Sequence, residues 1–178
     1  MEVIDTIKTI RSIRRYRSDA VPKEELSIIL EAARWAPSWA NTQCWRIVIV
    51  RNGDKRAMLA GTVPDWNPSR LAVSEAPVII VICAELGKSG FHKGKASTDK
   101  GDWYMFDVAL AAHNLTLAAH SLGLGTVHIG VFDAKKAASI LELPENIVVV
   151  ELIPLGYPAE EPKIPLRREI SEFVWFID

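Results

Sequence analysis

Apolar residues recur along this chain with two spacings, which separate the predicted helices from the predicted strands. Apolar positions three or four residues apart are typical of a helix with one buried face. This spacing predicts helices over residues 3–13, 22–37, 54–59, 102–122 and 133–141. Pro22 followed by Glu24 and Glu25 is typical of a helix start, because acidic side chains complement the exposed amides of the first turn.

Short, continuous runs of valine and isoleucine bounded by turn residues are typical of buried strands. They predict strands over residues 45–50, 77–84 and 147–155, with a further strand over 126–131. The helices and strands are mixed along the chain, without an internal repeat or a low-complexity tract. The chain has 178 residues, close to the roughly 150 of an average domain, so we expect a single domain over residues 1–178.

The segments between these elements differ in character. Residues 62–69 contain proline and tryptophan, and we expect them to form a surface loop. Residues 87–101 combine glycines and lysines with few apolar side chains, which predicts an irregular, mobile connection of the kind that forms a lid. The helix over 102–122 is apolar on most sides, so we expect it to be central and largely buried, with Phe106 among its packed residues.

Net charge and cysteine content argue against nucleic-acid binding, attraction to an anionic membrane and a disulfide-rich secreted protein. Lys plus Arg minus Asp plus Glu is 21 − 22 = −1, so the chain has no overall positive field to attract nucleic acid or an anionic membrane. The basic segment 8–17 keeps nucleic-acid binding as a third, less favoured alternative. Cys44 and Cys83 are too few for a disulfide scaffold, which favours a reducing compartment.

We expect neither a membrane segment nor a targeting segment. The longest apolar run, residues 78–84, is far shorter than the roughly 20 residues of a membrane-spanning helix. The first residues include acids and no long apolar block, so the pattern of a signal or transit peptide does not occur there. We therefore expect a cytoplasmic protein.

Common catalytic and metal-binding motifs do not occur in the sequence. It contains no Gly-x-Ser-x-Gly, no His-Glu-x-x-His and no Gly-x-Gly-x-x-Gly after a strand. His113 and His120 are separated on a helix by about 10 Å of rise, which is too far for both to bind one metal ion. We therefore predict no metal site and assign no catalytic acid or base.

Two polar blocks near the N-terminus carry candidate chemistry. Arg11, Ser12 and Arg14 lie in a cationic segment, and the two arginines, three residues apart on a predicted helix, are able to hold a phosphate and a second electron-rich group. Asn41 and Gln43 offer amide donors and acceptors to the edge of a heteroaromatic ring. The ordinary alternatives are a solvated charged face for the first block and turn chemistry for the second.

Two further blocks lie nearer the C-terminus. Glycines within residues 122–132 either allow a ligand to approach the backbone closely or simply end a helix and pack a strand. A proline-rich extended segment ends on Arg167 and Arg168, which either contribute to an anion site or form a surface charge pair. Residues 173–177 are strongly apolar for a chain end, which is consistent with packing on a partner subunit or on the same core.

In this order, the four blocks resemble the nitroreductase family of FMN-dependent oxidoreductases, and the resemblance spans nearly the whole chain. Residues 11–14 (Arg-Ser-Ile-Arg) resemble the family's Arg-Ser-x-Arg segment. Residues 36–45 (Ala-Pro-Ser-Trp-Ala-Asn-Thr-Gln-Cys-Trp) resemble its Ala-Pro-Ser-x-x-Asn-x-Gln-Pro-Trp segment. Residues 122–125 (Leu-Gly-Leu-Gly) resemble its glycine segment, and residues 156–158 (Gly-Tyr-Pro) with Arg167 resemble its closing blocks.

The resemblance implies an α+β fold with a central, mostly antiparallel sheet flanked by helices, in an intertwined homodimer whose flavin sites lie at the subunit interface. It also implies FMN as the cofactor. The implied cofactor-binding residues are Arg11, Ser12, Arg167 and Arg168 for the phosphate and ribityl chain, Arg14 for the pyrimidine ring, Asn41 and Gln43 for the ring edge beside Pro37 and Ser38 of the same motif, and Gly130 and Val131 near the reactive N5.

The implied activity is ping-pong transfer of a hydride from NADH or NADPH through flavin N5 to an electron-poor acceptor such as a nitroaromatic or a quinone. Trp103 and Tyr104 are candidates for stacking on the acceptor, with core packing as the favoured alternative. Ile10 stands where many members have a further arginine, and Cys44 stands where they have proline. Because segment 87–101 is short for the family, a flavin store or electron carrier that does not oxidise NAD(P)H is the alternative function.

Overall fold

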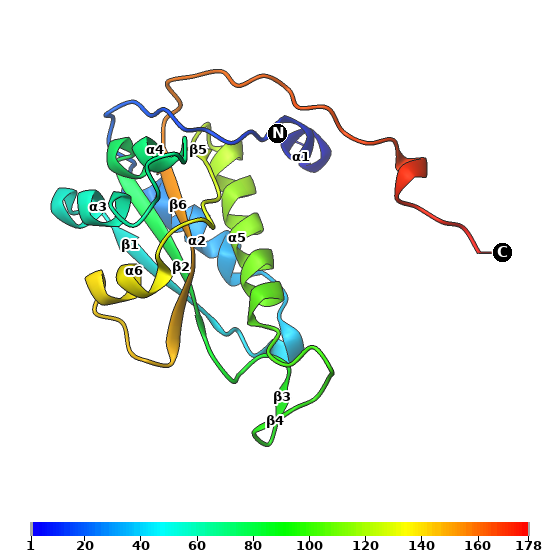
Figure 1. Ribbon diagram of the computed structural model, residues 1–178. Coiled ribbons are helices and arrows are strands. Elements are labelled where there is room, and N and C mark those ends of the chain that lie inside the picture. The colour runs from blue at the N-terminus through cyan, green and yellow to red at the C-terminus, as the bar shows by residue number, and fades with distance from the viewer. Residues whose placement is uncertain (1, 178) are drawn as a thin grey trace.

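A four-stranded antiparallel sheet forms the centre of the computed structural model, which describes residues 2–177 (Figure 1). The strand order is β1–β2–β6–β5, with β1 Trp45–Val50, β2 Val78–Glu85, β6 Ile147–Gly156 and β5 Gly125–Thr126. The strands predicted over 45–50, 77–84 and 147–155 are confirmed to within one residue at each end. The strand predicted over 126–131 is shorter, because beyond β5 only Ile129 pairs, through two 3.0 Å hydrogen bonds with Leu152.

Two layers of helices cover the two faces of this sheet. The first layer contains α2 (Lys23–Arg34) and α5 (Tyr104–Ser121), and the second contains α3 (Gly53–Ala60), α4 (Arg70–Glu75) and α6 (Ala134–Ile140). Successive side chains of a strand point to opposite faces, so Ile80 and Ile82 pack with the first layer, whereas Ile79 and Val81 pack with the second. All four are fully buried, which explains the continuous apolar run of β2.

The predicted helices occur, although their ends and exposed faces differ in part. The side chains of Asn52 and Asp133 cap α3 and α6, each accepting a backbone N–H hydrogen bond at 2.9 Å. The prediction that Phe106 packs in the core is wrong, since 56% of its surface is exposed. The buried positions of α5 lie on the side facing the sheet, and Phe106 lies on the other side.

The first helix is shorter than predicted. α1 spans Val3–Thr9, after which the chain runs extended along the sheet edge instead of remaining helical to residue 13. The backbone N–H of Ile13 donates to the Thr126 carbonyl at 2.9 Å. Gly125 permits this close approach, because a Cβ atom there would lie 2.6 Å from Ile13 Cγ1. Arg11 and Arg14 therefore do not share a helical face, which corrects the prediction.

The segment predicted as a surface loop over 62–69 is partly buried and leads into an additional helix. Thr62, Val63 and Ser69 are all buried. α4 follows directly and packs Ala72 and Val73 against the sheet. A helix of six residues is too short for apolar periodicity to indicate it.

Segment 87–101 is not irregular throughout. It contains a hairpin of β3 (Phe91–His92) and β4 (Lys95–Ala96), which projects from the body beside the start of α5 (Figure 1). Trp103 fixes the base of the hairpin. Its backbone N–H donates to the Ser89 carbonyl at 3.1 Å, and its indole N–H donates to Thr98 Oγ1 at 2.7 Å. We call residues 87–103 the hairpin segment.

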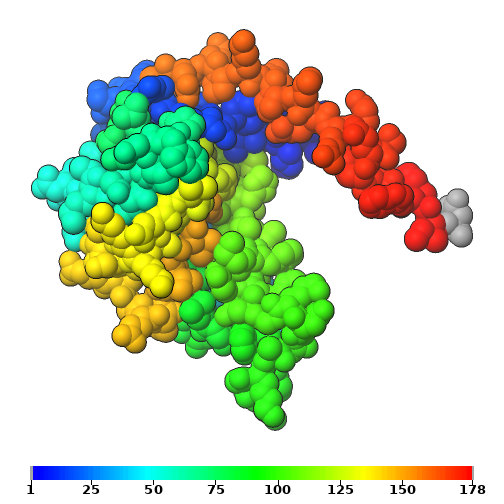
Figure 2. Space-filling view, in the orientation of Figure 1, coloured from blue at the N-terminus to red at the C-terminus, as the bar shows by residue number. Residues whose placement is uncertain are grey.

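The C-terminal tail extends away from the body of the molecule, as the orange and red residues in Figures 1 and 2 show. Apart from a short turn of 3-10 helix at Ile170–Glu172, it is extended, and it exposes 99% of Leu166 and 84% of Trp175. α1 likewise exposes an apolar face. Among residues 2–177, no helix is both long and apolar enough to cross a lipid bilayer.

Candidate functional site

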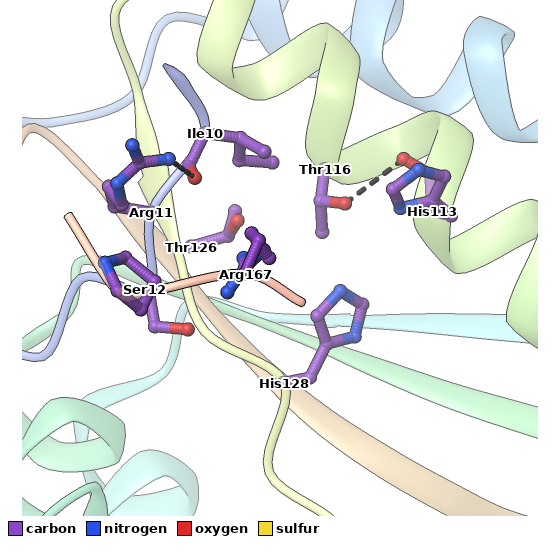
Figure 3. Close-up of a pocket in the computed structure, with 9 residues that line it drawn as sticks. Ile10, Arg11, Ser12, His113, Thr116, Thr126, His128 and Arg167 are labelled. Atoms are coloured by element: carbon purple, nitrogen blue, oxygen red, sulfur yellow. Dashed lines mark hydrogen bonds between the residues drawn. The ribbon is translucent and has the colours of Figure 1, made fainter. Parts of the chain in front are cut away.

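A cavity of about 230 Å³ lies where the segment after α1, the middle of α5, β5 and the tail meet (Figure 3). Its lining is rich in hydrogen-bond donors. It comprises two arginines (Arg11 and Arg167), three hydroxyl residues (Ser12, Thr116 and Thr126), two histidines (His113 and His128), and Ile10 and Pro165. A phosphate group, which is anionic and accepts several hydrogen bonds, suits this lining.

The fold brings these residues together from segments far apart in the sequence. A β-bridge places Ser12 beside Thr126. Arg11 Nη1 donates to the carbonyls of Lys8 and Ile10, both at 2.7 Å, which fixes the guanidinium at the end of α1. Arg167 reaches the cavity from the extended tail (Figure 3). Three of the residues predicted to hold a phosphate therefore line one cavity.

Other predicted site residues lie outside this lining. Arg14 is half-buried, its Nε donates to Ser69 Oγ at 3.1 Å, and it is not part of the lining. Arg168 is exposed in the tail and is not part of the lining. Gly130 and Val131 are exposed as well, in the chain segment that follows the lining strand β5.

His128 is a lining residue that no local sequence motif indicates. Its Nδ1–H donates to Glu151 Oε2 at 2.7 Å. This hydrogen bond raises the pKa of His128 above its ordinary value of 6.5, against the opposing effect of partial burial. The pair therefore presents a fixed and readily protonated imidazole to the cavity. Glu151 is 23 residues further along the chain, so only the pairing of distant segments reveals this contact.

The loop between α2 and β1 forms a second cluster at the start of α5. Asn41 and Gln43 border a hollow of about 350 Å³, whereas Pro37 and Ser38 border a neighbouring one of about 380 Å³ that also includes Trp103. Gln43 Nε2 donates to Asn41 Oδ1 at 3.2 Å, and the Gln43 backbone N–H donates to Ser38 Oγ at 3.0 Å. The two predicted ring-edge amides thus lie side by side at the surface. We call residues 36–43 the amide loop.

The two clusters are well separated within one chain. α5 contributes to both. Asp107 borders the hollow beside Pro37 and Ser38 of the amide loop, and Thr116 lines the cavity that contains Arg11 and Arg167, which we call the cationic cavity. Nine residues of α-helix correspond to about 14 Å of rise along the helix axis. One protomer therefore does not gather all the predicted cofactor-binding residues around a single cavity.

Metal and thiol chemistry receive no support from the part of the chain that the structure describes. Within residues 2–177, no group of three or more His, Cys, Asp or Glu side chains is arranged to hold a metal ion. Cys44 and Cys83 are buried free thiols, and burial raises the pKa of each to about 12. Neither is a ready nucleophile, because the thiolate is the reactive form.

Known proteins are similar to this chain in sequence. Residues 7–157 match the sequence profile of the nitroreductase family. A protein of Methanothermobacter thermautotrophicus is 38% identical over 168 residues, which cover 91% of this chain and 80% of that protein. The FMN reductase (NAD(P)H) of Bacillus subtilis is 31% identical over 182 residues, which cover 92% of this chain and 70% of the reductase.

A solved structure shares the fold as well. The NADPH:FMN oxidoreductase of Vibrio harveyi, solved as a complex with NAD+, has 29% identity and a TM-score of 0.83, covering 98% of this chain and 76% of its own. These matches confirm the predicted α+β fold with an antiparallel sheet between helices. Together with the profile match over most of the chain, they show that the protein belongs to the nitroreductase family.

Proposed function

We propose that the protein is an FMN-dependent oxidoreductase that transfers a hydride from NADH or NADPH to an electron-poor acceptor such as a nitroaromatic or a quinone. The cavity shared by Arg11, Ser12 and Arg167 carries this proposal, because its donors suit the phosphate of FMN. Family membership supports the same cofactor and donor, since relatives are named FMN reductase and NADPH:FMN oxidoreductase.

The residues present fit FMN at both of its ends. The cationic cavity would hold the phosphate, and Asn41 and Gln43 would bond the donors and acceptors of the ring edge. When bound, the flavin supplies hydride transfer at N5. The side chains of this protein therefore need only bind, orient and shield, and none has to act as an acid or base.

We propose that two copies of the chain complete each site in a homodimer. The amide loop and the cationic cavity are separate hollows about 14 Å apart along α5, and a second copy would bring its own amide loop to the cavity. The exposed apolar side chains of α1 and the tail offer the surface for this contact.

Arg14→Ala is expected to slow the reduction of bound flavin by NAD(P)H roughly tenfold while FMN stays bound. The proposal places Arg14 beside the pyrimidine ring, where a cation stabilises the negative charge that develops on reduction. Stopped-flow absorbance measures the rate. Arg15→Ala is the matched control, because Arg15 is exposed and pairs with Glu75 at 2.9 Å. Equal rates for Arg14→Ala and the wild type would exclude the pyrimidine role.

FMN affinity is expected to fall as the pH rises above 6.5 and through the raised pKa of His128, because the imidazole then loses its proton. The raised pKa keeps the imidazole partly charged above 6.5, so the extra affinity is present below this pKa and is lost as the pH rises through it. The second ionisation of a phosphate group, near pH 6, lies below this range.

Calorimetric titration with FMN at several pH values measures this dependence. His128→Gln should bind FMN with a nearly flat pH profile, whereas His113→Gln, which removes the other imidazole of the lining, should keep the wild-type slope. If FMN affinity depends on pH equally in the wild type and in His128→Gln, then the charge of His128 does not contribute to phosphate binding.

Steady-state turnover tests the proposed reaction itself. With NADH or NADPH as donor and a quinone or nitroaromatic as acceptor, double-reciprocal plots should give parallel lines, because donor and acceptor use the same pocket in turn. A flavin-loaded protein that consumes neither donor with any acceptor would instead favour the flavin store or electron carrier.

A further inference from the structure

Asp107 is a fully buried carboxylate to which the proposed reaction assigns no role. Its Oδ1 accepts a hydrogen bond from the backbone N–H of Trp39 at 3.0 Å. Its Oδ2 accepts from the Ser89 hydroxyl at 2.7 Å and from the Thr42 hydroxyl at 3.3 Å, and the Cys44 thiol adds a weaker contact at 3.7 Å. A buried acid of this kind is held firmly, because losing its partners would leave polar groups without hydrogen bonds.

The donors to Asp107 belong to separate segments of the chain. Trp39 and Thr42 both belong to the amide loop, where they flank Ala40 and Asn41. Ser89 lies in the hairpin segment, where its carbonyl accepts from Trp103. One side chain of α5 therefore connects the amide loop to the hairpin segment.

The amide loop needs support because of its backbone conformation. Ala40, Asn41 and Gln43 have φ values of 46°, 58° and 48°. Residues other than glycine adopt this left-handed region rarely, and it persists where the surrounding structure holds it. The carboxylate of Asp107 binds Trp39 and Thr42, the residues directly before Ala40 and directly after Asn41. These hydrogen bonds therefore hold both ends of the left-handed pair.

Asp107 is not needed to begin α5, because Asp102 serves that end of the helix. Asp102 Oδ1 accepts from the Tyr104 N–H at 3.0 Å, and its Oδ2 accepts from the Gly87 N–H at 2.7 Å. Asp102 therefore lies at the same end of α5 as Asp107. It binds the hairpin segment through Gly87 but makes no hydrogen bond with the amide loop. It provides a matched control for Asp107.

We propose that Asp107 is a positioning residue for the flavin ring, which holds Asn41 and Gln43 in their ring-binding arrangement and couples the amide loop to the hairpin segment. The inference rests on the proposed function, in which these two amides contact the ring edge. Burial and the charge of Asp107 raise the pKa of the Cys44 thiol to about 12, so this thiol stays protonated and keeps donating to the carboxylate.

Titration of variants with FMN and with riboflavin tests the positioning role. Asp107→Leu removes the acceptors at similar size and is expected to weaken both ligands equally, by about tenfold or more, because both contain the same ring. Asp107→Asn keeps a carbonyl oxygen that accepts from the Trp39 N–H, and its amide group can donate to the Ser89 and Thr42 hydroxyls, which then act as acceptors. The affinities of this variant for both ligands should therefore stay within about threefold of the wild type. Asp102→Ala should lower the melting temperature and leave both affinities unchanged.

Trypsin digestion of the flavin-free protein tests the coupling. The hairpin segment contains Lys88, Lys93, Lys95 and Lys100. Ser89→Ala and Asp107→Leu are expected to speed cleavage in this segment about threefold or more, because each releases it from the carboxylate. Equal cleavage rates in the wild type and both variants would overturn the coupling.

The outcomes separate this inference from the proposed function. A wild-type protein that binds neither FMN nor riboflavin would overturn the proposed function and, with it, the positioning role, whereas the digestion still decides the coupling. A wild type that binds both, with Asp107→Leu binding them as tightly, would overturn the positioning role alone.

If Asp107→Leu does not fold, Thr42→Val removes one donor from the same carboxylate and should weaken the binding of both FMN and riboflavin about threefold. Unchanged affinities of Thr42→Val would then overturn the role.

Discussion

Arg11→Ala and Arg167→Ala are each expected to weaken FMN binding roughly 10- to 100-fold while leaving riboflavin binding nearly unchanged. Both arginines line the cationic cavity. Losing a hydrogen bond between charged groups costs about 1.5–3 kcal/mol, and each 1.4 kcal/mol corresponds to about tenfold in affinity. Riboflavin keeps the ribityl chain but lacks the phosphate, so it does not lose these hydrogen bonds between charged groups. Fluorescence titration with the two ligands measures both dissociation constants.

The control for these substitutions is Arg51→Ala, which removes an exposed arginine outside the cavity. It should bind FMN as the wild type does. The comparison with riboflavin separates phosphate recognition from ring recognition, since the Asp107 variants weaken both ligands alike. Equal weakening of FMN and riboflavin by Arg11→Ala and Arg167→Ala would place the phosphate elsewhere.

Removing residues 170–178 is expected to convert the proposed dimer into a monomer that loses its flavin on desalting. The truncation keeps Arg167 and removes exposed apolar side chains, namely Ile170, Phe173, Trp175, Phe176 and Ile177. Burying a side chain of this kind contributes about 1.5–3 kcal/mol, so their loss removes much of the free energy of a subunit interface. A monomer would also leave each cationic cavity without an amide loop from a second copy.

Sedimentation velocity and the flavin content per chain measure the two effects of the truncation. Trp66→Ala is the control, because Trp66 is 74% exposed and lies far from the tail in the sequence. This variant should remain a dimer with bound flavin. A truncated protein that stays dimeric and keeps stoichiometric flavin would show that the tail does not form the interface.

Local patterns predicted the centre of the sheet well, because β2 is buried on both faces and reads as an unbroken apolar run. They failed where distant segments decide the structure. Residues 10–13 were predicted to be helical, but Ser12 and Ile13 instead pair with Thr126 of β5. Phe106 is apolar yet faces outward, and nothing in the helical spacing of α5 distinguishes an exposed apolar face from a buried one.

The candidate site was predictable only in part, for a related reason. Arg11, Ser12 and Arg167 follow from motifs in the sequence, and the structure gathers them in one cavity. His128 and Glu151 interact across 23 residues, and no spacing rule links them. Asp107 likewise appears in the sequence as one acid in an apolar helix, and only the fold brings donors from two loops to it.

Anaerobic addition of NADH, and then NADPH, to the purified flavin-loaded protein tests the assigned reaction most directly. We predict that the visible absorption of oxidised flavin disappears with one of these donors and returns when a quinone is added. Bound flavin whose spectrum both donors leave unchanged would contradict an NAD(P)H oxidoreductase.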